Sequence, residues 1–123
     1  MSDPAAVIKA CLEAIWEGNS AALAGHPAYG PDLHATTIRT LHGAFADLKG
    51  TVDRQFVDGE WVSSWATLSG TLTGDLPYAK ANGQWLEWKQ ASVAQIVDGK
   101  VVYYEGVSAL AQILTRKNVS SPQ

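Results

Sequence analysis

The sequence is poor in cysteine, in clustered basic residues and in long apolar runs. Its one cysteine, Cys11, has no second cysteine to pair with, and no Cys/His spacing resembles a zinc or other metal site. The 9 Lys and Arg residues are scattered among 12 Asp and Glu residues, which argues against a nucleic-acid partner. No apolar run approaches the roughly 20 residues of a membrane span, and residues 1–4 do not resemble the start of a signal peptide. We therefore expect a cytoplasmic protein with no membrane partner.

The composition is that of an ordinary folded chain. It has 123 residues, of which 46% are hydrophobic and 17% charged. A chain of this length buries about two-thirds of its unfolded surface, enough for a core without disulfides or metals. We expect one domain over residues 1–123, with 118–123 as a frayed tail.

Apolar residues spaced three and four apart predict two helices in the first third of the chain. The first follows a cap at Ser2 or Asp3 and ends at 18–19, and a short helical turn follows at 20–23. Glycines and prolines then predict a loop that carries His26 and Tyr29. The second helix is expected from Pro31 to about residue 45.

From residue 51 the apolar period changes to two, which predicts strands. We expect strands at 51–57, 60–73, 84–97 and 100–107, with Asp-Gly turns at 58–59 and 98–99 and a last short helix at 108–116. Helices followed by an antiparallel meander indicate an α+β fold with the helices on one face of the sheet.

The strand at 60–73 is too long to stay straight in a domain of this size. It would extend about 46 Å, so we expect a bend, with a bulge or kink at Gly70. One face of this strand carries small and medium side chains: Val62, Ser64, Ala66, Leu68, Gly70 and Leu72. This face indicates either a cavity beneath the helices or helices packed closely against the sheet.

Five segments, taken in order, resemble one known family. They are the tryptophan-bearing first helix and the segments after it, at residues 14–23, 44–48, 57–62, 69–74 and 97–102. Together they resemble the SnoaL-like polyketide cyclases of the nuclear transport factor 2-like superfamily. The resemblance implies a strongly curved antiparallel sheet whose N-terminal helices enclose a conical pocket, as in a cystatin-like cone. It also implies a homodimer and no bound cofactor.

The resemblance predicts a small-molecule cyclase or isomerase of polyketide-type secondary metabolism, as in antibiotic biosynthesis. The family's cyclases use a histidine at the position of Leu72 and an aspartate near Leu86, and neither polar group is present here. The acid/base group has therefore moved, or the pocket acts by holding an apolar substrate in a reactive conformer. The alternative is a binding protein with the same pocket and no chemistry.

Glu105 is the candidate acid/base residue. It follows an apolar and aromatic run on a central strand, where desolvation would raise the pKa of its carboxyl group toward neutrality. Alternation places Tyr103 on the same face as Glu105 and Tyr104 on the other, and we assign Tyr103 and Glu105 to the pocket. His26, expected at the pocket mouth, completes the predicted catalytic set. The alternatives are a solvated or ion-paired glutamate and a solvated loop histidine.

The predicted substrate-binding wall consists of Tyr29, Leu33, Ser64, Leu68, Leu72 and Trp88. His34 and His42 are assigned structural or surface roles, because neither has a spaced partner for a metal. Trp61 and Trp65 project from the face that the helices leave bare, and exposed tryptophans on a sheet typically mark an interface. We expect a homodimer through this face.

Overall fold

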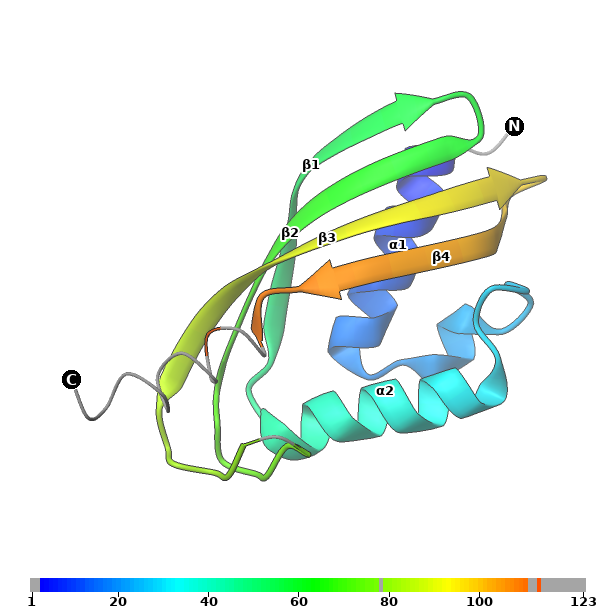
Figure 1. Cartoon of the computed structure of the whole chain (residues 1–123). Coiled ribbons are helices and arrows are strands. Elements are labelled where there is room, and N and C mark those ends of the chain that lie inside the picture. The colour runs from blue at the N-terminus through cyan, green and yellow to red at the C-terminus, as the bar shows by residue number, and fades with distance from the viewer. Residues whose placement is uncertain (1–2, 78, 111–112, 114–123) are drawn as a thin grey trace.

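The computed structural model describes residues 3–77, 79–110 and 113, the side chains of 31–35 excepted. The helical elements are α1 (Pro4–Glu17), the 3₁₀ turn η1 (Ser20–Leu23) and α2 (Pro31–Ala44). The strands are β1 (Lys49–Asp58), β2 (Trp61–Thr71), β3 (Trp85–Val97) and β4 (Lys100–Ser108), paired antiparallel in the order β1-β2-β3-β4. The sheet curves around the helices, which lie on one of its faces (Figure 1). The predicted α+β fold is confirmed.

Local signals set the helix ends where the sequence predicts them. The Asp3 carboxylate accepts a hydrogen bond from the backbone N–H of Ala5 at 3.1 Å and caps α1. Gly18 ends this helix with a φ of 75°, which favours glycine. Of the predicted last helix, Leu110 is helical and the N–H of Ile113 bonds to the Ala109 carbonyl, while the rest of it and the tail lie outside the described residues.

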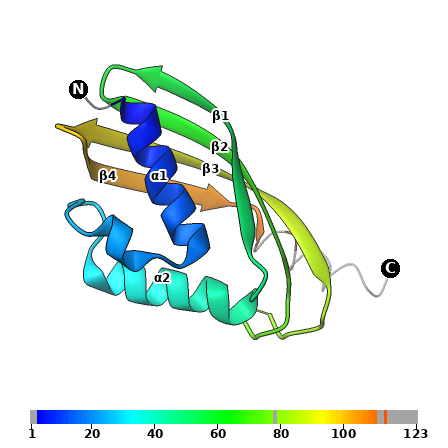
Figure 2. The ribbon, with the colours of Figure 1, turned by 180° about the vertical axis from the view of Figure 1, so that it is seen from behind.

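The inner face of the sheet, which faces the helices, carries the core. Along β2, the residues predicted for this face are buried. At the first turn of α1, the Gln55 Nε2 atom donates to the Ala5 carbonyl at 3.0 Å and to the Ser64 hydroxyl at 3.3 Å. Small side chains on β2 therefore let α1 pack closely on this half of the sheet. Figure 2 shows from behind how α1 lies across the inner face of the sheet. Of the two interpretations of this face, close helix packing holds here.

Gly70 permits a close contact and does not form a bulge. The register between β2 and β3 is unbroken from Trp61 opposite Gln95 to Thr71 opposite Trp85, so the bulge expected at Gly70 is absent. A Cβ on Gly70 would lie 2.8 Å from the Phe45 ring. The Phe45 ring centroid lies 5.0 Å from that of Trp88. The glycine makes room for this aromatic pair.

The two edge strands each carry a register shift. In β1 the shift lies between Val52 and Arg54, and in β4 it lies opposite Gln95 and Ile96. In β4 Val101 pairs with Ile96 and Tyr103 with Gln95, so Val102 is the extra residue of a bulge. Beyond Val102, the alternation of inward and outward side chains is therefore shifted by one residue.

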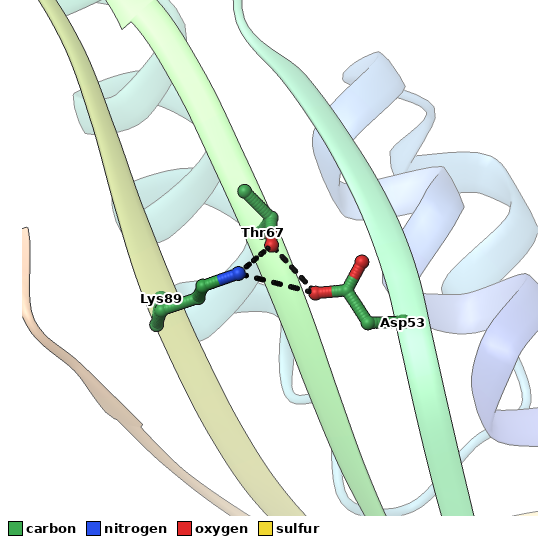
Figure 3. A network of polar contacts seen from close by, with 3 residues as sticks. All are labelled: Asp53, Thr67 and Lys89. Atoms are coloured by element: carbon green, nitrogen blue, oxygen red, sulfur yellow. Dashed lines mark hydrogen bonds and ion pairs between the residues drawn. The ribbon is translucent and has the colours of Figure 1, made fainter.

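No described helix covers the outer face of the sheet, opposite the inner face. Large hydrophobic side chains are exposed there, among them Trp61 and Trp65. Lys89 donates to the Thr67 hydroxyl at 2.6 Å and lies 3.7 Å from the Asp53 carboxylate, which also accepts from Thr67 (Figure 3). Because this network on β1, β2 and β3 is exposed, it contributes little to stability.

Within the described part of the chain, no helix combines the length and the apolar character that crossing a membrane requires.

Candidate functional site

A cavity of about 340 Å³ lies between the helices and the β3–β4 half of the sheet. Its volume is at the lower end of the range for small-molecule sites, about 300–1,000 Å³. The helices and the loop after η1 supply one side of the cavity, and β3 and β4 supply the other. It is lined by Leu12, Ile15, Trp16, Leu23, Tyr29, Thr37, Ile38, Leu41, Gln90, Tyr104, Gly106, Val107 and Ser108.

The wall is apolar with a few neutral polar groups. Hydroxyls come from Tyr29, Thr37, Tyr104 and Ser108, and the one amide comes from Gln90. None of the described lining side chains is a carboxylate, an amine, a guanidinium or an imidazole. The described side chains therefore offer a ligand hydrogen-bonding groups and apolar surface, and none of them offers a charge.

Tyr104 and Gln90 form a bonded pair on the strand side of the cavity. The Gln90 Nε2 atom donates to the Tyr104 phenol oxygen at 3.3 Å. Burial raises the pKa of Tyr104 above its ordinary value, and hydrogen bonding with Ser92 and Gln90 acts in the opposite direction. The phenol keeps its proton at neutral pH and remains a donor.

Tyr29 reaches the cavity from a loop that is fastened to β4. The Ala28 N–H donates to the Val101 carbonyl at 2.9 Å, and the Val101 N–H donates to the Nδ1 atom of His26 at 3.0 Å. The Tyr29 ring centroid lies 5.5 Å from that of Tyr104, and burial raises the pKa of Tyr29. The loop therefore places a second phenol beside the first.

Comparison with protein families identifies the chain. The family model described as SnoaL-like polyketide cyclase matches residues 6–115. The chain belongs to this family. The recognition made from the sequence is confirmed, and the fold agrees with it.

Solved structures share the fold at low sequence identity. IdmH from Streptomyces antibioticus, described as a candidate polyketide cyclase, is 16% identical with a TM-score of 0.80, and the match covers 95% of this chain and 99% of that one. TsrD from Streptomyces laurentii is 21% identical with a TM-score of 0.76, and the match covers 98% and 99%. AclR from Streptomyces galilaeus, described as a candidate hydroxylase, is 20% identical with a TM-score of 0.75, and the match covers 95% and 98%. No curated protein matches the chain.

In this SnoaL-like chain, Glu105 and Tyr103 face away from the cavity. The Tyr103 hydroxyl donates to the Glu105 Oε1 atom at 2.7 Å, and the Tyr103 side chain is 43% exposed on the outer face. Its ring lies against Trp61, with centroids 5.8 Å apart. The expectation that both residues line the pocket is wrong, because the bulge at Val102 shifts the alternation and turns Tyr104 inward instead.

His26 positions the loop and does not line the cavity. Its Nδ1 atom is occupied as the acceptor for Val101, so it is not available there as a base. Burial, and then the positive charge of Lys100, lower the pKa of His26. His26 was expected at the pocket mouth as part of the catalytic set. In the structure it is a neutral hydrogen-bond acceptor that holds the loop carrying Tyr29 against β4.

The residues predicted for the substrate wall lie in different parts of the structure. Tyr29 lines the cavity, whereas the side chain of Leu33 lies outside the described ones. Four other predicted wall residues are buried in the core and do not line the cavity: Ser64, Leu68, Leu72 and Trp88. Ser64 and Leu68 on β2 face inward as predicted, but α1 and Phe45 fill the space in front of β2. Trp88 on β3 packs against the Phe45 ring.

Sequence reasoning missed the strand-side wall of Gln90, Tyr104 and Gly106. One available signal was that Gln90 shares its face with Trp88, which alternation places toward the helices. The apolar stripe of α1 gave a second signal, since Leu12, Ile15 and Trp16 all line the cavity. The positions of Leu72 and Leu86, where the family's polar groups are expected, are buried in the core.

Proposed function

We propose that this chain is a cyclase or isomerase of polyketide-type secondary metabolism that binds a neutral substrate and holds it in a reactive conformer. The observation that carries the proposal is the apolar cavity with neutral polar groups on its walls. Membership of the polyketide cyclase family supports the reaction class, as does the shared fold with IdmH, described as a candidate polyketide cyclase. A cytoplasmic location stays a prediction from the sequence.

The cavity suits catalysis by conformational restriction. Holding two reacting groups of one molecule in contact replaces a costly search through chain conformers, and effective molarities of about 10⁵–10⁸ M are known for well-oriented reactions. In an intramolecular aldol closure, the carbon next to one carbonyl loses a proton and bonds to a second carbonyl carbon, whose oxygen gains a proton. The product is an isomer of the substrate. The proton released by carbon and the proton taken up by oxygen balance through solvent, and none of the described lining side chains is a carboxylate, an amine or an imidazole.

A binding protein with the same pocket is the alternative function. The observation that favours it is the neutral lining, since the tyrosine phenols Tyr29 and Tyr104 both have raised pKa values and stay protonated near pH 7. Such a wall can hold a ligand without moving a proton. Binding is therefore common to both functions, and turnover separates them.

Aryl-substituted 1,5-diketones test the proposal, because they are neutral and can close a six-membered ring. Binding is measured by quenching of tryptophan fluorescence, since Trp16 lines the cavity. Ring closure is measured by mass spectrometry as an isomer separated by chromatography, or as a product one water lighter after dehydration. We expect saturable binding and ring closure faster than in buffer.

The matched control is Ile38→Trp, which places an indole in the cavity from α2. This variant is expected to stay folded by circular dichroism and to lose both binding and ring closure. If the diketones bind and none of them closes its ring, the result supports the alternative function of a binding protein. Equal quenching by wild type and Ile38→Trp would show that the cavity is not the site.

A further inference from the structure

The Tyr104 phenol lies along its own strand over a glycine. A Cβ on Gly106 would lie 2.9 Å from the Tyr104 hydroxyl oxygen and 3.3 Å from Cζ. Both residues line the cavity, because they are two residues apart on β4, beyond the bulge, and therefore share one face of the strand. The missing side chain at 106 therefore sets where the phenol rests on the wall.

The hydrogen bond to Gln90 leaves the phenol proton available. An amide nitrogen only donates, so in the bond from Gln90 Nε2 the Tyr104 oxygen is the acceptor. The phenol also hydrogen-bonds with Ser92, a buried hydroxyl that can donate as well as accept. Tyr104 can thus accept from its neighbours and donate its own proton to a ligand.

The surroundings restrict which ligand this donor suits. None of the described lining side chains carries a charge, so an anionic ligand would be desolvated without a cationic partner. A carbonyl oxygen is neutral and accepts one or two hydrogen bonds. Its carbon skeleton would meet the apolar helix side of the cavity, where Leu12, Ile15 and Leu41 lie.

We propose that Tyr104, positioned by Gln90 and Gly106, donates a hydrogen bond to a carbonyl oxygen of a neutral ligand with an apolar skeleton. The inference rests on the proposed use of the cavity and names the chemistry that the cavity recognises. Tyr104 is the contact residue, and Gln90 and Gly106 are positioning residues. The skeleton of the ligand lies toward the helices and its oxygen toward β4.

Two probe molecules of similar shape test this donor directly. 2-Acetylnaphthalene has the carbonyl acceptor, and 2-ethylnaphthalene lacks it. A neutral hydrogen bond contributes about 0.5–1.5 kcal/mol, so we expect the wild type to bind the ketone about 3- to 10-fold more tightly than the ethyl compound. In Tyr104→Phe this preference is expected to vanish while binding of 2-ethylnaphthalene is kept.

Tyr103→Phe is the matched control, because it removes the neighbouring hydroxyl from the outer face. It is expected to keep the wild-type preference. Gly106→Ala, which forces the phenol to move, is expected to reduce the preference, whereas Gly43→Ala has no atom within 4 Å of its new Cβ and is expected to keep it. The infrared stretch of a ¹³C-labelled carbonyl is expected to shift to lower frequency on binding to the wild type and not on binding to Tyr104→Phe.

The outcomes separate this inference from the proposed function. If the wild type binds both probes equally, or if Tyr104→Phe keeps the preference, the donor assignment is wrong and the cavity stands as a binding site. If neither probe binds, both the donor assignment and the use of the cavity for neutral apolar ligands are overturned. If Tyr104→Phe fails to fold, Gly106→Ala and the infrared shift in the wild type decide the question.

Discussion

Tyr103 and Tyr104 are adjacent in β4 and lie in opposite surroundings. Tyr104 lies in the cavity wall beneath the helices, and its hydroxyl oxygen accepts a hydrogen bond from Gln90. Tyr103 stands on the outer face, 43% exposed, and donates to Glu105. The two phenols have the same chemistry, so the cover that the helices supply on one face decides what each can do. The following expectations test this contrast between the faces.

The largest difference is expected between two phenylalanine truncations. Phe45, at the end of α2, is fully buried against the inner face, whereas Phe56 on β1 is 56% exposed on the outer face. Phe45→Ala is expected to lower the free energy of unfolding by about 3–5 kcal/mol, because it leaves a cavity beside Trp88. Phe56→Ala is expected to lower it by less than about 1 kcal/mol.

Urea denaturation of both variants, followed by circular dichroism, measures this difference. Equal losses for Phe45→Ala and Phe56→Ala would mean that the outer face is as well packed as the inner one, for example by a second chain. Repeating the measurement over a hundredfold range of protein concentration distinguishes that case.

Formation of a homodimer is expected to depend on the part of the outer face that carries Trp61 and Trp65. Trp61, Trp65 and Phe56 are exposed there at 42%, 47% and 56%. Such a group of apolar side chains is typical of an interface, and we expect it to join two copies of this chain. Trp65→Glu is expected to weaken the dimer by about 30-fold or more, the size of a hot-spot loss of about 2 kcal/mol.

Light scattering over micromolar concentrations measures this effect. Trp85→Glu is the matched control, because Trp85 is 59% exposed but pairs with Thr71 at the far end of β2. It is expected to keep the wild-type mass. A wild-type protein that is monomeric at high micromolar concentration would contradict the prediction.

The smallest effect on the free energy of unfolding is expected from protonation of His26, in the loop that carries Tyr29. The pKa of His26 is lowered in the folded state by burial and by Lys100, so the unfolded chain binds the proton more readily. Stability is therefore complete above the ordinary histidine pKa of about 6.5 and falls as the pH drops from there toward the lowered value. We expect a lower free energy of unfolding at pH 5.5 than at pH 7.5.

His26→Asn isolates this contribution. The asparagine oxygen can replace Nδ1 as the acceptor for Val101, and it does not titrate in this range. The variant is expected to lose less stability than the wild type between the two pH values. The same loss in both proteins would assign the effect to another group.

The order of elements could be predicted from the sequence because it depends on local signals. Caps, Asp-Gly turns and the change of apolar period place the helices and strands from α1 to β4 within about two residues of their observed ends. The end of β2 was predicted two residues late, because the Thr73 and Gly74 N–H groups turn away and bond to the Ala44 carbonyl. That contact is long-range and leaves no mark on the local pattern.

The site could be predicted less well, because it depends on packing. The alternating pattern correctly predicted that Ser64 and Leu68 face inward. It could not show that α1 covers that half of the sheet and leaves a cavity over the β3–β4 half. Alternation also failed at Val102, where a bulge adds a residue without any glycine or proline to signal it.

The bulge at Val102 also limits what can be inferred about relatives from spacing alone. A relative that lacked the extra residue and had a regular β4 would still place the counterpart of Tyr104 in its cavity. The reason is that the bulge accommodates Val102 without changing which side the later residues face. A chain of equal length with a regular strand would present the counterparts of Tyr103 and Glu105, and its cavity would be acidic. Aligned positions in β4 therefore identify equivalent side chains only when the strand pairing of each residue is known. Two similar sequences can enclose chemically different cavities.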